Sequence, residues 1–269
     1  MVKKFKDEMS FLEHLEELRW VIIKSLFAIV VGGTIAFFFR QFIFDNIILI
    51  PRTPEFITNK ILCKIGAMIN SQGLCINQNP VELQNITMGG QFNMHIRVAI
   101  ISGFIISFPY IFYQFWNFVA PALKPNERKY ARSAIIYSSL LFIIGILFGY
   151  FILLPFSIDF LTSYSVSEQI ENKINFVSYV TNITSVVLAC GIIFELPIVV
   201  YFLASVGILT SEIMKKYWKH AIVIILVIAA IITPPDVVSQ VLVSLPLFLL
   251  YLASILIAKK IEIKRIKEE

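Results

Sequence analysis

Residues 10–39 read SFLEHLEELRWVIIKSLFAIVVGGTIAFFF and place a charged opening directly before a long apolar run. Ser10 is followed three positions later by Glu13, a spacing typical of the capping box at a helix N-terminus. From Trp20 onward, Lys24 is the only charged side chain before position 40. About 20 apolar residues are enough for one helix to cross the hydrocarbon core of a bilayer. The stretch therefore predicts a helix that begins near Ser10 and crosses a membrane.

The composition extends this prediction to the whole chain. Of its 269 residues, 58% are hydrophobic and 15% are charged, whereas soluble domains carry about 25% charged residues. Four further apolar runs approach spanning length, at residues 98–116, 134–156, 183–206 and 237–258. A shorter run, residues 221–232, would extend only about 18 Å as a helix. It could be a buried segment, a re-entrant piece or a true crossing in a locally thinned bilayer.

The distribution of positive charge favours the last of these alternatives. When the loops are assigned alternately to two sides, 17 of the 23 Lys and Arg residues fall on the side of the N-terminus. Positive residues concentrate in cytoplasmic loops, and this asymmetry requires an even number of crossings. We therefore predict an all-α membrane protein with six transmembrane helices and both termini in the cytoplasm (N-in/C-in). The net charge of +5 is then a topology signal and does not indicate binding of nucleic acid.

Two carboxylates on the cytoplasmic side are candidates for a binding site. Glu17 has no Lys or Arg three or four positions away, and Glu127 lies among several cations in the loop after the second run. Two carboxylates at the same depth on a basic surface would suit a ligand with adjacent guanidinium groups. The alternative is that Glu17 is a solvated surface charge and Glu127 a surface ion pair.

A third carboxylate lies within an apolar run. Glu195 in FELP would cost about 3 kcal/mol to place at the centre of a membrane on insertion scales, so it is functional, protonated, or both; a structural hydrogen bond to another helix is the alternative. Pro197 should kink this helix. In TPPDVVSQ, residues 233–240, Asp236 is placed to cap the last helix, and Gln240 should point away from lipid.

The cysteines and the absence of known catalytic motifs limit which reactions and metal sites the sequence allows. Cys63 and Cys75 both fall in the loop after the first helix, and they could form a disulfide or remain free thiols. Cys190 in the fourth run reads as a small core residue. The sequence contains no zinc-protease motif, phosphate-binding loop, serine-hydrolase elbow or cysteine-rich metal spacing. We therefore expect no enzymatic activity, no cofactor and no metal.

Four motifs in order resemble the TatC family, the polytopic core of the twin-arginine protein translocase. They are FLEHLEELR at residues 11–19, FPYIFYQFWNFVAPALKPNER at 108–128, FELP at 194–197 and TPPDVVSQ at 233–240. The resemblance covers nearly the whole chain and implies a single polytopic domain over residues 1–269 with a concave, glove-like bundle. One departure is a longer loop after the first helix, about residues 40–93, and residues 259–269 form a cytoplasmic tail.

The resemblance also implies a function. Members of the family bind signal peptides that carry two consecutive arginines and export folded proteins on the proton-motive force, together with single-span TatA-type and TatB-type partners. The residues expected at the signal peptide are Glu17, Leu18, Arg19, Phe118 and Glu127. Those expected at partner helices are Gln114, Glu195, Asp236 and Gln240. We expect a homo-oligomer in lipid, in a bacterial inner membrane. The alternative is a proton-coupled secondary transporter of a small solute, in which Glu195 would carry the proton.

Overall fold

The computed structural model describes residues 11–70, 72–79, 82–120, 131–167, 169, 172–233 and 237–268. Most of these residues are helical. Among them, only β1 (Leu83–Gln84) and β2 (Ile174–Asn175) are strands, and the two pair in parallel with Leu83 opposite Ile174. This short pairing joins the loop before the second long helix to the loop before the fourth.

Five helical stretches of 26 to 31 residues are apolar enough to span a membrane. At about 1.5 Å per residue each is longer than the ~30 Å hydrocarbon core. They are formed by α1 (Phe11–Phe38), α4 (Gly90–Val119), α6 to α7 (Ala131–Phe148 and Leu154–Ser163), α8 to α9 (Phe176–Ile193 and Leu196–Val206) and α12 (Val237–Glu268). The five long runs predicted from the sequence are thereby confirmed as helices. The short run is the 15-residue helix α11 (Trp218–Ile232), which follows α10 (Ser211–Lys216).

Two of the long stretches are interrupted. Between α6 and α7 the backbone widens into one π-helical turn, η5 (Gly149–Leu153). Between α8 and α9 the helix breaks at Phe194 and Glu195, with Pro197 in the first turn of α9. Proline lacks the backbone donor that a continuous helix needs, so the predicted kink at Pro197 is confirmed as a break that includes Glu195.

Glycines allow two helix pairs to approach closely. Gly103 on α4 lies against Gly33 on α1, where an added Cβ would overlap the α1 backbone. Ser107, one turn further on, donates a hydrogen bond of 2.7 Å to the carbonyl of Ala28. Gly145 on α6 packs in the same way against the backbone of α8 at Cys190. Small residues of this kind are typical of helix contacts in membranes, where packing rather than water exclusion holds helices together.

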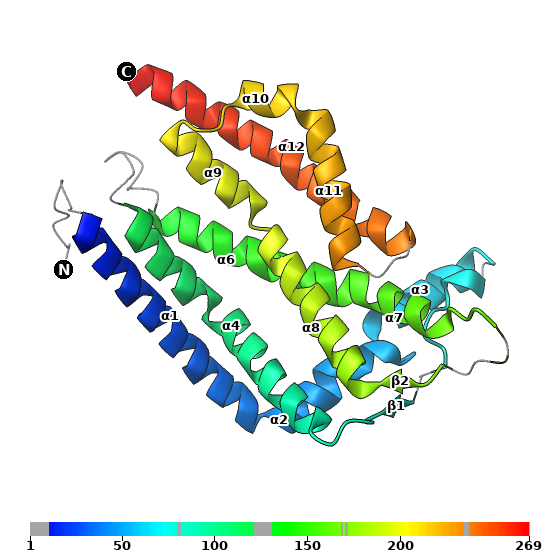
Figure 1. The fold of residues 1–269 in the computed structure, drawn as a ribbon. Helices are drawn as coiled ribbons and strands as arrows, with labels where there is room; N and C mark the ends of the chain where they lie inside the picture. Colours follow the sequence, from blue (N-terminus) through cyan, green and yellow to red (C-terminus); the bar gives the residue numbers. More distant parts are fainter. Residues whose placement is uncertain are drawn as a thin grey trace.

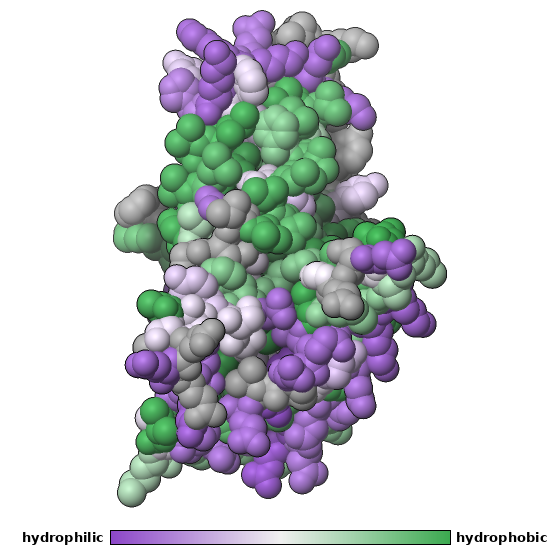
Figure 2. Space-filling model, turned by 90° about the vertical axis from the view of Figure 1, so that its right-hand side faces the viewer, coloured by the Kyte–Doolittle hydropathy of each residue, from purple (hydrophilic) through white to green (hydrophobic). Residues whose placement is uncertain are grey.

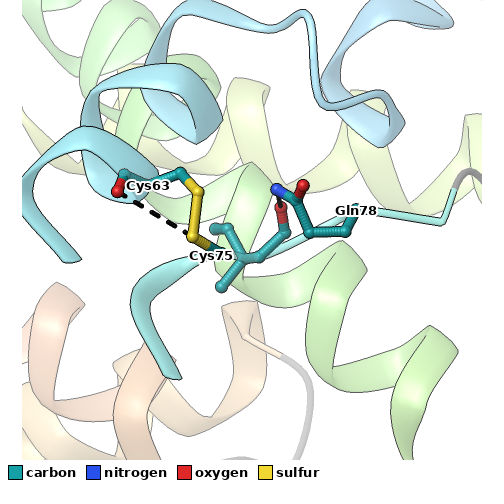
Figure 3. The surroundings of a disulfide bond; sticks show 4 residues. Cys63, Cys75 and Gln78 are labelled. Atoms are coloured by element: carbon teal, nitrogen blue, oxygen red, sulfur yellow. Dashed lines mark hydrogen bonds between the residues drawn. A yellow bond between two sulfur atoms is a disulfide. The ribbon is translucent and has the colours of Figure 1, made fainter. Parts of the chain in front are cut away.

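The long segment after α1 is more helical than a loop. It contains α2 (Arg40–Ile43), η1 (Phe44–Ile48), η2 (Ile50–Arg52), α3 (Ile57–Met68) and η3 (Gln72–Leu74). We call the segment from α2 to β1 the cap. A disulfide joins Cys63 on α3 to Cys75 after η3 (Figure 3). The buried Asn77 ties the cap to the body, because its backbone nitrogen donates to Asp159 and its side chain to the carbonyl of Pro155.

The ends of the bundle differ in composition from its middle. The start of α1 and the end of α12 lie at one end, here called the terminal end, and the cap lies at the other, the cap end (Figure 1). Figure 2 shows a band of hydrophobic residues on one face, with hydrophilic residues above it and mostly hydrophilic residues below. Such a band, together with five helices of spanning length, identifies a multi-pass membrane protein.

Candidate functional site

The first turns of α1 present two different faces. His14, Glu17 and Val21 are half-buried, whereas Leu15 and Leu18 are exposed. Positions three and four apart share one face of a helix, so the half-buried side chains form a single stripe. Glu17 therefore lies on the side of α1 that faces the protein, and Leu18 and Arg19 lie outside this stripe.

An aromatic contact connects this stripe to the end of α4. The ring of His14 stacks on that of Phe118 with centroids 4.2 Å apart and planes at 19°. Two residues earlier, Trp116 is almost fully buried and packs against Phe202 of α9, with centroids 4.9 Å apart. The stacked pair and the buried tryptophan together fix the last turn of α4 between α1 and α9.

Glu17 lies three residues after His14, on the same face of α1. No hydrogen bond or ion pair joins it to any of the residues that the structure describes. A half-buried carboxylate that is paired with no described residue can accept hydrogen bonds from a guanidinium group, and such bonds are stronger than those between neutral groups. The geometry on α1 thus leaves a binding position for a cationic ligand.

The other residues expected at this end are placed as follows. Gln114 is buried on α4, one turn before Phe118. Glu127 lies in residues 121–130, outside the described part of the chain, so its distance from Glu17 is untested. Arg19 is exposed on α1. The structure therefore brings Glu17 close to the end of α4, and the pairing of Glu17 with Glu127 stays a prediction.

A second polar position lies in the middle of the bundle. Glu195 is half-buried at the break between α8 and α9, and it accepts a hydrogen bond of 2.7 Å from the Ser138 hydroxyl of α6. Phe194, beside it, is buried and packs on Phe148, with centroids 5.4 Å apart. A carboxyl group at a helix break, held by one hydroxyl, can also bind a polar group of another helix.

The motif at the cap end of α12 is partly described. The amide of half-buried Gln240 donates to the carbonyl of Leu226 on α11, at 3.4 Å, so it links the two helices of the α11–α12 pair. This agrees with the expectation that Gln240 points toward protein. Asp236 belongs to residues 234–236, which lie outside the described part of the chain, and its capping role stays a prediction.

Sequence reasoning missed two of these contacts. His14 and Ser138 were not expected to contact Phe118 and Glu195. Their partners lie 104 and 57 residues away, and periodicity within one helix carries no information about such distant pairs. The signal that could have found His14 is its position three residues before Glu17, on the same helix face.

Comparison with known proteins agrees with the motifs. The model of the family described as Sec-independent protein translocase protein (TatC) matches residues 13–246. The TatC protein of Blattabacterium sp. subsp. Periplaneta americana (strain BPLAN) is 40% identical over 259 residues, which cover 96% of this chain and 97% of that protein. The TatC protein of Helicobacter pylori (strain ATCC 700392 / 26695) is 37% identical over 248 residues, 92% of this chain and 87% of that protein.

Solved structures show the same likeness in three dimensions. The crystal structure of the twin-arginine translocase receptor TatC superposes with a TM-score of 0.68 at 35% identity, covering 93% of this chain and 99% of that one. A second crystal structure of this receptor, in DDM, gives a TM-score of 0.69 at 36% identity, with 91% of this chain and 99% of that chain covered. Motif order, family match and fold agree over most of the chain, and the chain therefore belongs to the TatC family of Sec-independent protein translocase proteins.

Proposed function

We propose that this chain is the signal-peptide receptor and core subunit of a twin-arginine translocase. It binds signal peptides with two consecutive arginines at the terminal end. Glu17 is one acceptor, and Glu127, in the loop after α4, is the second. The observation that carries the proposal is the half-buried position of Glu17 on the helix face that also carries the stacked His14, with no hydrogen bond or ion pair to any described residue. Leu18, Arg19 and Phe118 border this position.

Arginine suits this site better than lysine. The guanidinium group is planar and presents paired donors that match a carboxylate, whereas the ammonium group of lysine is a point charge. One hydrogen bond to a charged group contributes about 1.5–3 kcal/mol, which corresponds to roughly 10–150-fold in affinity. Two such acceptors would therefore select an Arg-Arg pair strongly over an uncharged pair.

The test is binding of a labelled Arg-Arg signal peptide to the detergent-purified chain, with a Lys-Lys peptide beside it. We expect Glu17→Gln to weaken Arg-Arg binding by roughly 10–150-fold, since one charged acceptor is lost. Glu16→Gln is the matched control, because Glu16 is the adjacent residue and is exposed on another face of α1. Equal affinity in both variants, or equal binding of both peptides to the unmodified chain, would rule out the guanidinium site.

We assign the second polar position to partner helices. Glu195, held by Ser138 at the α8–α9 break, would accept a polar group from a TatA-type single-span protein, with Gln114, Gln240 and Asp236 as further contacts. In this proposal the protein has six spans, both termini in the cytoplasm and a concave face, and it acts in a bacterial inner membrane without enzymatic activity. A TatB-type partner and further copies of the chain complete the receptor, and the proton-motive force drives export.

This division of roles predicts separable defects. Glu195→Gln should leave signal-peptide binding within twofold and strongly reduce export of a folded reporter from cells, because the carboxylate lies on α8–α9 and the peptide site on α1 and α4. Binding to purified chain and export are measured on the same variant. Loss of peptide binding in Glu195→Gln would show that the two positions form one site. The alternative of a proton-coupled solute transporter is not favoured by the family match.

A further inference from the structure

Helix α3 of the cap carries an unusual surface. Its exposed side chains include Ile57, Ile61, Ile65 and Met68, with exposed fractions of 56%, 51%, 44% and 82%. Their spacing of four, four and three residues places all of them within about 80° of the helix circumference. Single exposed apolar residues are common, but an aligned row of four large ones marks an interaction surface. We call this row the α3 stripe.

The opposite side of α3 is fixed to the protein, so the stripe has a defined direction. Asn59 is completely buried and donates hydrogen bonds to the carbonyls of Pro51 and Thr53. The disulfide between Cys63 and Cys75 closes the loop at the middle of the helix. Because buried polar groups resist displacement from their partners, α3 cannot roll over to hide the stripe.

The attachment of α3 also sets its depth. The hydroxyl of Thr58 donates to the carbonyl of Phe151, at 2.6 Å, and the buried Phe56 stacks on the Phe151 ring with centroids 5.6 Å apart. Phe151 lies 18 residues after Ser133, where the third spanning stretch begins. At 1.5 Å per residue this is about 27 Å along the helix, close to the ~30 Å thickness of the hydrocarbon core. The first turn of α3 therefore lies near the boundary between hydrocarbon and headgroups.

Charge borders the stripe on one side only. Lys60 and Lys64 are exposed and lie one after the other along the edge of the stripe, and Ala67 continues that edge. Exposed Glu55 precedes the helix. A helix with large apolar residues on one exposed strip and lysines beside it is typical of segments that lie in the plane of a membrane interface. Lysines at this depth reach anionic headgroups. Each lysine near the surface contributes about 1 kcal/mol of binding free energy to an anionic membrane.

We infer that α3 is an interfacial helix that inserts its stripe into the outer leaflet, with Lys60 and Lys64 on anionic lipid headgroups. The assignment to the outer leaflet rests on the topology given under the proposed function. Lipid is the occupant because the hydrogen bond from Thr58 to Phe151 places the first turn of α3 at the depth where the third spanning stretch leaves the hydrocarbon core. In this arrangement the cap is anchored in the membrane as well as to the protein, through a helix that its disulfide holds in place.

The test measures the depth of two positions on α3 by nitroxide labelling. Ile61→Cys probes the stripe, and Ala67→Cys is the matched control, since Ala67 is exposed about 120° away on the same helix. Both are made with Cys190→Ala, and only chain with the Cys63–Cys75 bond intact by mass spectrometry is used. The full chain is placed in vesicles of phosphatidylglycerol and phosphatidylethanolamine, and collisions with oxygen, which enters the bilayer, are compared with those of a water-soluble nickel chelate.

We expect the ratio of oxygen to nickel collisions to be severalfold higher at Ile61 than at Ala67. A water-like ratio at both positions would overturn the inference, and so would exclusion of both reagents at Ile61, which would mean that protein covers the stripe. Replacing phosphatidylglycerol by phosphatidylcholine, or Lys60 and Lys64 by Gln, should make Ile61 shallower; an unchanged ratio would overturn the headgroup contact.

Failure of this inference can be told apart from failure of the receptor proposal. The same labelled Ile61→Cys chain is assayed for Arg-Arg peptide binding, which depends on the opposite end of the bundle (Figure 1). Normal peptide binding with a water-like ratio at Ile61 would count against the interfacial helix alone. A high ratio with absent peptide binding would count against the receptor alone.

Discussion

His14 is the residue that connects the candidate peptide site to the rest of the bundle. Its ring lies 4.2 Å from that of Phe118, and the loop that carries Glu127 begins directly after the last turn of α4. Stacked aromatic pairs contribute about 0.5–1.5 kcal/mol beyond the area that they bury. The contact is thus strong enough to hold the end of α4 beside the first turns of α1, although His14 need not touch the peptide.

Substitution of His14 tests this positioning role. We expect His14→Ala to weaken Arg-Arg peptide binding by roughly 2–12-fold, the equivalent of the lost stacking energy, and to leave the chain folded. His14→Phe keeps an aromatic ring at the same place and should restore most of the affinity. Binding to purified chain and Tm in mild detergent are the measurements. If His14→Phe binds as weakly as His14→Ala, the imidazole itself takes part, and stacking is not the explanation.

At the scale of elements, the α1–α4 pair holds the two halves of the candidate site together. Glu17 and His14 belong to α1, Phe118 to α4, and the two helices approach closely at Gly33 and Gly103. A side chain at position 103 would force the backbones apart, because the atoms that it meets are backbone atoms that cannot rotate away. We therefore expect close packing at this crossing to help position the site residues several turns away.

We expect Gly103→Ala to destabilise the bundle by about 1–3 kcal/mol, as overpacking does in tightly packed cores. For a chain of this size the Tm in detergent should fall by roughly 2–12 °C. Gly89→Ala is the control, since the nearest atom to an added Cβ there is the Asn93 amide nitrogen at 3.5 Å. Equal Tm values for the two variants would show that the helices can separate at Gly103 without loss.

Helices and breaks that depend on a short stretch of sequence could be predicted, whereas those that depend on distant contacts could not. The long apolar runs and the break at Pro197 depend on composition and on one proline, and both could be predicted. The cap was expected as an extended loop, and the helix α3 within it was not predicted. In the structure α3 has buried Asn59 on one side and exposed isoleucines on the other. This pattern depends on contacts with Pro51 and Thr53 and not on helix periodicity alone. The His14–Phe118 contact has no local signal at all.

At the scale of the whole molecule, the short helix α11 decides the topology. Its 15 residues extend about 22 Å, less than the ~30 Å core, yet the proposed six-span arrangement needs it to cross. Lys215 lies before α11, and Lys260 follows the apolar run of residues 237–258 near the end of α12. The two lysines lie on the same side of the membrane only if α11 crosses, because α12 crosses once.

This relation gives a direct test of the six-span arrangement. We expect Lys215→Cys and Lys260→Cys, each made with Cys190→Ala, to react with a membrane-impermeant maleimide from the cytoplasmic side only. Ser165→Cys, exposed in the loop between α7 and β2, should react from the opposite side and controls for vesicle orientation. Labelling of positions 215 and 260 from different sides would show that α11 does not cross. The chain would then have five spans and an external C-terminus, and the excess of positive charge at that terminus would need another explanation.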